Sequence, residues 1–121
     1  SNDKAKTLVT DSNTYANGRV ELYTPNCTSF DIIINATSLS LHGEVPNLPN
    51  SIFENNPCVY DMVYLSEPTV FMQLARAEGC TTTIDGLGML VHQAAHSFYL
   101  WFAFQPDCAP VYQYLRNMNM D

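Results

Sequence analysis

Hydrophobic and polar positions change their spacing several times along the chain, and each change predicts a new element. Segment 31–35 contains three consecutive isoleucines without alternation, which is typical of a parallel strand buried on both faces. Segment 70–75 spaces its apolar residues as one face of a helix, which Pro68 opens and Gly79 ends. Similar reasoning predicts further helices over 3–15, 51–54, 87–104 and 109–118, and further strands over 20–23, 58–64 and 80–84.

Strands and helices alternate from residue 31 onward, and this order is typical of an α/β fold with a parallel sheet covered on both faces. Ligands of such sheets bind beyond the carboxyl ends of the strands. Three consecutive strands end in polar residues, at 35–38, 61–64 and 85–88. The sequence therefore predicts a binding site at this edge of the sheet.

The segment that begins the long helix carries two glycines, Gly86 and Gly88, followed by a lone amide side chain, Gln93. Glycine lets a ligand approach the backbone closely, and the first N–H groups of a helix favour negative charge. Gln93 lies among apolar residues and is a candidate ligand contact. The alternative is an ordinary helical first turn with a solvated glutamine.

Composition narrows the possible partners. The 121 residues carry a formal charge of −7, which argues against nucleic acid and anionic membrane surfaces. No apolar run reaches the roughly 18 residues that a membrane-spanning helix needs, and the first residues lack the apolar segment of a signal peptide. The four cysteines form no CxxC pair, which favours a reducing, cytoplasmic environment.

Local motifs for catalysis are weak. His92 and His96 share a helix face, as zinc ligands do, but Gln93 stands where a zinc protease has its glutamate base, so no metal site is expected. No GxGxxG phosphate loop occurs. Asp61 and Asp85 end strands and are either bases or caps of a turn and a helix.

Five blocks together resemble shikimate dehydrogenases, in that family's order and spacing. They are Asn35-Ala36-Thr37-Ser38, Tyr60-Asp61-Met62-Val63-Tyr64, Asp85-Gly86-Leu87-Gly88-Met89-Leu90-Val91 with Gln93-Ala94-Ala95, Leu100-Trp101, and Pro106. The resemblance extends over 4–115. It implies an NADP-dependent enzyme of the shikimate pathway, which leads to chorismate and the aromatic amino acids, and which reduces 3-dehydroshikimate to shikimate by hydride transfer.

The resemblance also implies how the chain is organised. Residues 1–86 correspond to the later part of a Rossmann-like NADP-binding domain, and residues 87–121 to C-terminal helices that return to the substrate domain. The family's glycine-rich loop, its substrate-binding serines and its catalytic lysine and aspartate match nothing in this chain. We therefore expect the chain by itself to be inactive.

Individual functions follow by position. The resemblance assigns Lys4, Thr37, Met62 and Gly86 to NADP, and Tyr64 and Gln93 to the substrate. The chain departs from the family where Ser40 and Ala103 replace frequent glycines. Alternative functions are a quinate/shikimate-type dehydrogenase with relaxed substrate or NAD preference, and a non-catalytic interaction module.

Self-association is a further expectation. In the Rossmann strand order 3-2-1-4-5-6, the chain would supply strand 3, near Val20, and strands 4 to 6. Strands 1 and 2 would be missing, which leaves the isoleucine strand with an unpaired edge. The long helix also carries more aromatic residues than one face can bury. We therefore expect copies of the chain to associate through this strand or this helix.

Overall fold

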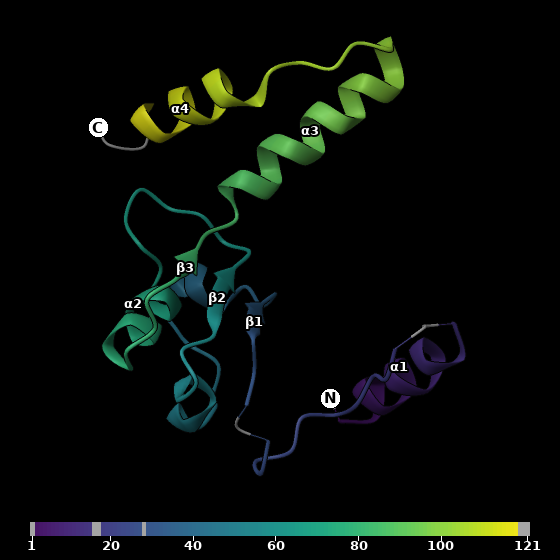
Figure 1. The fold of residues 1–121 in the computed structure, drawn as a ribbon, viewed down its shortest axis with the longest axis vertical. Helices are drawn as coiled ribbons and strands as arrows, with labels where there is room; N and C mark the ends of the chain where they lie inside the picture. Colours follow the sequence, from purple (N-terminus) through teal and green to yellow (C-terminus); the bar gives the residue numbers. More distant parts are fainter. Residues whose placement is uncertain (1, 16–17, 28, 119–121) are drawn as a thin grey trace.

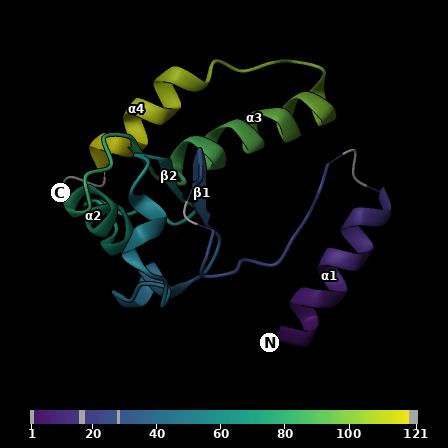
Figure 2. The ribbon, with the colours of Figure 1, turned by 60° about the horizontal axis from the view of Figure 1, so that its bottom comes forward.

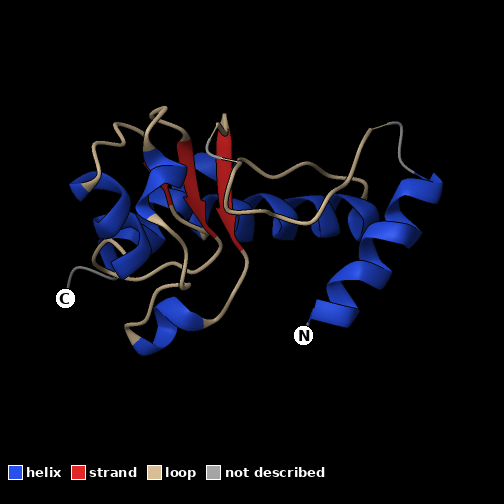
Figure 3. Ribbon diagram, turned by 90° about the horizontal axis from the view of Figure 1, so that it is seen from below, coloured by secondary structure: helices blue, strands red, loops and turns tan. Residues whose placement is uncertain are grey.

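Three parallel strands form the centre of the fold in the computed structural model, which describes residues 2–15, 18–27 and 29–118 (Figure 1). The strands are β1 (Ile32–Asn35), β2 (Cys58–Asp61) and β3 (Thr83–Ile84), in the order β1-β2-β3. The register places Ile34 opposite Tyr60, and Tyr60 opposite Ile84. This confirms the predicted α/β fold with a partial Rossmann-like sheet (Figure 3).

Helices and short turns surround this sheet at positions close to those predicted. They are α1 (Asn2–Tyr15), the 3₁₀ turns η1 (Leu39–His42) and η2 (Asn50–Phe53), α2 (Val70–Ala77), α3 (Leu87–Phe102) and α4 (Cys108–Met118). Helices α3 and α4 form an antiparallel hairpin beyond one end of the sheet, whereas α1 lies apart from the sheet (Figures 1 and 2).

The core lies between β2 and α2. Val59 and Ala75 are fully buried there, and Phe53 and Phe71 pack their rings 6.1 Å apart. Cys80 belongs to the same buried cluster, as expected of a cysteine that packs as a small hydrophobe, and Cys58 is half-buried. All four cysteines have free thiols. In the described residues, no helix is both long and apolar enough to cross a bilayer.

The prediction that the isoleucine strand is buried on both faces is wrong. Ile33 packs against the core, but Ile32 and Ile34 keep 60% and 61% of their surface exposed. Successive side chains of a strand point to opposite faces, so Ile32 and Ile34 lie on the face away from the core. Ile84 is aligned with Ile34 through Tyr60 and is 46% exposed, so this face of the sheet is open.

The predicted strand at 20–23 is also absent, because this segment is an extended loop in the described structure. Both backbone groups of Val20 bond to one side chain of α1. Its N–H donates to Oδ1 of Asn13, and its carbonyl accepts from Nδ2 of Asn13, each at 2.7 Å. These two groups point to the same side of an extended chain, so the amide takes the place that a neighbouring strand would occupy.

Candidate functional site at the carboxyl ends of the strands

The three polar strand ends lie side by side, as the parallel arrangement requires. Beyond the strands, the N–H of Met62 donates to the carbonyl of Asn35 at 3.0 Å, and the N–H of Gly86 donates to the carbonyl of Val63 at 3.2 Å. These bonds connect segments 35–38, 61–64 and 85–88 into one edge, which we call the rim. The structure thus brings together residues that are up to 53 positions apart, from 35 to 88, as the sequence predicted.

A buried polar network lies beneath the rim, centred on Asp61. Its side chain is fully buried and each carboxylate oxygen accepts two hydrogen bonds. Oδ1 accepts from the N–H of Val63 at 3.1 Å and from Nδ2 of Asn35 at 3.4 Å. Oδ2 accepts from the hydroxyls of Ser40 at 2.6 Å and Thr69 at 2.7 Å. An ionised carboxylate is an acceptor only, so all four bonds satisfy it and its burial is compensated.

Gly86 fits the rim for a reason that requires no ligand. A Cβ atom at this position would lie 1.9 Å from the carbonyl oxygen of Met62. The close approach is therefore between two backbone segments of the chain itself. Gly88, in contrast, has open space around the corresponding position.

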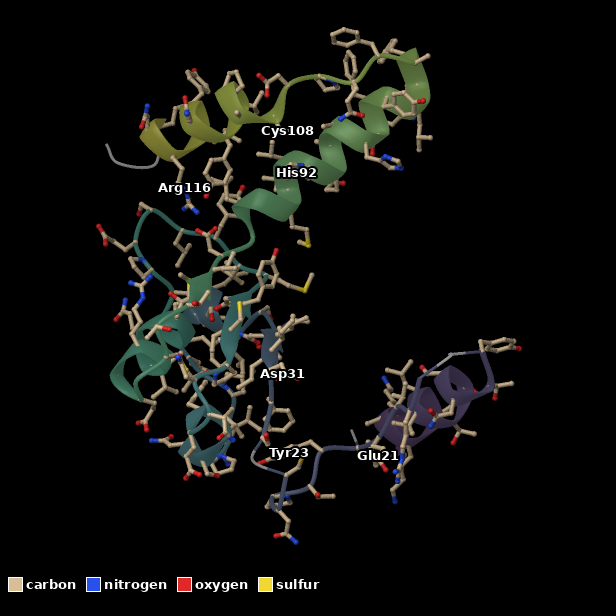
Figure 4. The ribbon with its side chains drawn as sticks, in the orientation of Figure 1. Glu21, Tyr23, Asp31, His92, Cys108 and Arg116 are labelled. Atoms are coloured by element: carbon tan, nitrogen blue, oxygen red, sulfur yellow. The ribbon has the colours of Figure 1, made fainter. Side chains whose placement is uncertain are left out.

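Asp85 precedes Gly86, the N-cap of α3, and binds both the first N–H of that helix and a cation from α4. Its Oδ1 accepts from the N–H of Leu87 at 3.2 Å and from Nη2 of Arg116 at 2.6 Å. The Arg116 side chain extends from α4 toward the sheet (Figure 4). The hydrogen bond to Asp85 raises the pKa of Arg116 above its ordinary value. Burial, and secondarily the charge of Asp85, raises the pKa of the Tyr60 phenol. Both strand-end aspartates thus hold turn or helix N–H groups, which favours the capping interpretation.

Side chains that the resemblance assigns to ligands differ in placement. Thr37 is exposed on the rim, and its hydroxyl donates to Oδ1 of Asn35 at 2.7 Å. Met62 and Tyr64 are each 39% exposed, so both can contact a ligand. Gln93 is exposed on α3, and its Nε2 donates to the carbonyl of Leu90 at 3.2 Å. Lys4 belongs to α1, which lies away from the rim (Figure 1).

The apolar face of α3 near Gln93 is turned to α4 rather than to the rim. Val91 and Ala95 are buried, and between the two helices lies an apolar pocket of about 440 Å³. His92 and His96 are exposed on α3, in agreement with a solvated helix flank. In the described ranges, no group of three or more His, Cys, Asp or Glu residues could hold a metal ion.

Two contributors to the site escaped the sequence reasoning. Thr69 accepts from the N–H of Met72 as the N-cap of α2 while its hydroxyl donates to Asp61. A threonine directly after proline and before a helical pattern is a recognisable cap signal. Arg116 pairs with Asp85 from 31 positions away, and no local pattern announces this contact.

Comparisons with known proteins support the resemblance to shikimate dehydrogenases. A family model described as "Shikimate 5'-dehydrogenase C-terminal domain" matches residues 86–116. A protein of Saccharophagus degradans named "Shikimate dehydrogenase (NADP(+))" is 56% identical over 91 residues, which cover 75% of this chain and 33% of that protein. Its namesake from Cellvibrio japonicus is 49% identical over 112 residues, with coverage of 93% and 40%. The chain thus spans a third to two fifths of these curated relatives.

Among solved structures, almost the whole chain is similar to part of the ligand-free 5-ketofructose reductase of Gluconobacter sp. strain CHM43. The two are 34% identical with a TM-score of 0.72, and the match covers 96% of this chain and 44% of that one.

Proposed function

We propose that this chain, which is similar to a shikimate dehydrogenase over about three quarters of its length, supplies the nicotinamide and substrate rim of an NADP-dependent shikimate dehydrogenase. The observation that carries the proposal is the alignment of three polar strand ends on one edge, beside the first turns of α3. Ligands of open α/β sheets bind at such an edge.

The rim suits one end of NADP better than the other. Residues 35–38, 61–64 and 85–88 include no lysine or arginine, and Arg116, which reaches Asp85 from α4, is bonded to that carboxylate. An uncharged nicotinamide ring fits an environment without a free cation, whereas phosphate groups are typically bound by arginine or lysine. We therefore assign Thr37, Met62 and Gly86 to the nicotinamide half. Lys4 remains the proposed phosphate contact, although α1 lies apart from the rim.

Tyr64 and Gln93 are the proposed substrate contacts. Shikimate is a ring acid with several hydroxyl groups, and a phenol and an amide can each donate and accept hydrogen bonds to such groups. Both side chains are exposed and so need no rearrangement of the core to bind. When bound, NADP would exchange a hydride with the carbon that carries the reacting oxygen of shikimate.

Proton transfer is the step for which neither aspartate of the rim is free. Asp61 is fully buried with four hydrogen bonds, and Asp85 holds Arg116 and the N–H of Leu87. A positioned acid or base contributes about 10²- to 10⁴-fold to such a reaction. We therefore expect the chain alone to bind NADP and shikimate weakly and to show no measurable turnover.

A chimera tests this proposal. In the Saccharophagus enzyme, the matching 91-residue segment is replaced by that of this chain, and NADP-dependent oxidation of shikimate is measured. We expect an active chimera in which Gln93→Ala lowers kcat/KM by about 10- to 100-fold, because a hydrogen bond to a polar ligand is lost. The control, Gln113→Ala on the exposed surface of α4, leaves kcat/KM unchanged. An inactive but folded chimera, or equal kcat/KM in both variants, contradicts the proposal.

The substrate has a specific alternative. The similar structure that covers 96% of this chain is a 5-ketofructose reductase, so a different polyhydroxylated ketone is the second candidate. The same chimera assayed with 5-ketofructose and NADPH decides between them. A higher kcat/KM for 5-ketofructose than for 3-dehydroshikimate favours this candidate.

We also propose that the chain acts in the cytoplasm and associates with copies of itself. The open sheet face and edge of β1 support association, since a groove of about 260 Å³ runs along Ile32, Ile33 and Ile34. The aromatic end of α3 adds Trp101, which is 74% exposed. Light scattering at tens of micromolar tests this part, and a monodisperse monomer contradicts it.

A further inference from the structure

A single buried carboxylate joins the segments of the rim, and we propose that Asp61 and Ser40 are its positioning residues. They act on the ligand through Thr37 and Met62 rather than by touching it. In naming the ligand as NADP the inference rests on the proposed function. The hydrogen bonds that carry it do not depend on that assignment.

Each bond to Asp61 fixes a different part of the rim. The N–H of Val63 holds the backbone between Met62 and Tyr64. Asn35 donates to Asp61, and with its own Oδ1 it accepts both the N–H of Thr37 at 3.1 Å and the Thr37 hydroxyl at 2.7 Å. One carboxylate therefore sets the position of residues on two neighbouring strand ends.

Ser40 holds the same loop from its other side. This residue lies in η1, three positions after Thr37, and is 3% exposed. Its hydroxyl donates to Asp61 at 2.6 Å and accepts from Nδ2 of Asn35 at 3.3 Å. A hydroxyl that donates to a carboxylate at this distance forms one of the stronger hydrogen bonds in proteins. Ser40 stands where the resembling family often has glycine, which has no hydroxyl to form this bond.

Hydrogen bonds of Thr69 connect the hub, which is the network of hydrogen bonds around Asp61, to helix α2. The Thr69 hydroxyl donates to Asp61 and accepts the N–H of Met72, the third residue of α2. A shift of the carboxylate thus moves the start of α2 and the rim together. A loop without such hydrogen bonds samples several conformations. A ligand that binds only one of these conformations then binds with reduced affinity.

Amide hydrogen exchange in the full 121-residue chain measures the positioning directly. In Ser40→Ala, we expect exchange at the amides of Thr37 and Val63 to become about tenfold faster, because a charge-assisted bond to the hub is lost. The amide of Thr81, bonded to Asn56 at 2.8 Å away from the hub, is expected to stay unchanged. The control variant Ser97→Ala removes a serine hydroxyl that donates to a carbonyl of α3 at 3.0 Å. It leaves all three amides unchanged.

Binding of NADP⁺, followed by chemical shifts in the same samples, separates positioning from fold maintenance. Well below the melting temperature, we expect Ser40→Ala to retain its helical circular dichroism and to bind NADP⁺ about three- to tenfold more weakly. Ser40→Gly, which removes the hydroxyl at a position that tolerates glycine in the resembling family, should behave alike and replaces Ser40→Ala if the latter does not fold.

Unchanged exchange at Thr37 and Val63 would overturn the inference, and so would faster exchange with an unchanged Kd for NADP⁺. Absence of NADP⁺ binding by the unaltered chain counts instead against the proposed function. In that case the exchange rates alone decide whether Asp61 and Ser40 hold the rim.

Discussion

Replacement of Gly86 by alanine tests how the rim is built. A Cβ at this position would lie 1.9 Å from the carbonyl oxygen of Met62 and 2.6 Å from its carbonyl carbon. Neither atom can move without shifting β2 or α3, because Gly86 also donates its N–H to Val63. Overpacking in a core typically costs about 1–3 kcal/mol. Two colliding backbone segments should cost at least the upper value of this range. We therefore expect Gly86→Ala to lower the free energy of unfolding by at least about 3 kcal/mol.

Thermal unfolding followed by far-ultraviolet circular dichroism measures this loss without any ligand. For a chain of this size, 3 kcal/mol corresponds to a decrease in Tm of about 10–15 °C. The matched control is Gly88→Ala, where a Cβ meets no atom within 4 Å and alanine favours the helix. This variant should keep its Tm or gain up to about 1 kcal/mol. If the two variants melt within about 2 °C of each other, the close backbone approach at Gly86 is refuted.

Three further predictions concern the stability of the folded chain. Ala103 ends α3 with a φ of +51°, so Ala103→Gly should raise the free energy of unfolding by about 1 kcal/mol; a lower Tm would contradict this. Arg116→Met should lower that free energy by about 1–3 kcal/mol, because the carboxylate of Asp85 loses its cation. The control Arg19→Met removes an exposed ion pair and should change the free energy of unfolding by less than about 0.5 kcal/mol. Equal losses in the two variants, measured by urea unfolding, would contradict the prediction for Arg116. Burial raises the pKa of Tyr60 above its ordinary 10.0, so folding favours the neutral phenol. The free energy of unfolding that is present below pH 10 therefore decreases as the pH rises through the pKa of the folded state. Tyr60→Phe should reduce this alkaline loss, as measured by urea unfolding at about pH 9 and about pH 11.

Local chemistry made much of the fold predictable. Gly79 has a φ of +96° after α2, as its predicted capping position requires. The alternation of strands and helices was enough to place three strand ends on one edge, because parallel strands have all their carboxyl ends together. These features depend on short stretches of sequence, and they appear in the structure within a few residues of the predicted bounds.

Features set by distant partners were not predictable. Three isoleucines indicate a strand, but they cannot reveal that the face with Ile32 and Ile34 stays open. Val20 has a typical strand sequence around it, yet the side chain of Asn13 takes both of its backbone hydrogen bonds. The sequence predicts a close approach to the backbone of Gly86, but it does not reveal that the carbonyl of Met62, 24 positions earlier, lies there.

If the three strand ends form one ligand-binding rim, a chemical-shift map of the chain will locate both ligands there. The isotopically labelled chain is titrated with NADP⁺ and then with shikimate, up to about 10 mM, which detects even millimolar binding. We expect the resonances of Thr37, Met62 and Gly86 to shift with NADP⁺, and those of Tyr64 and Gln93 to shift with shikimate. Shifts confined to α1 or α4, or no shifts at these concentrations, would contradict this expectation.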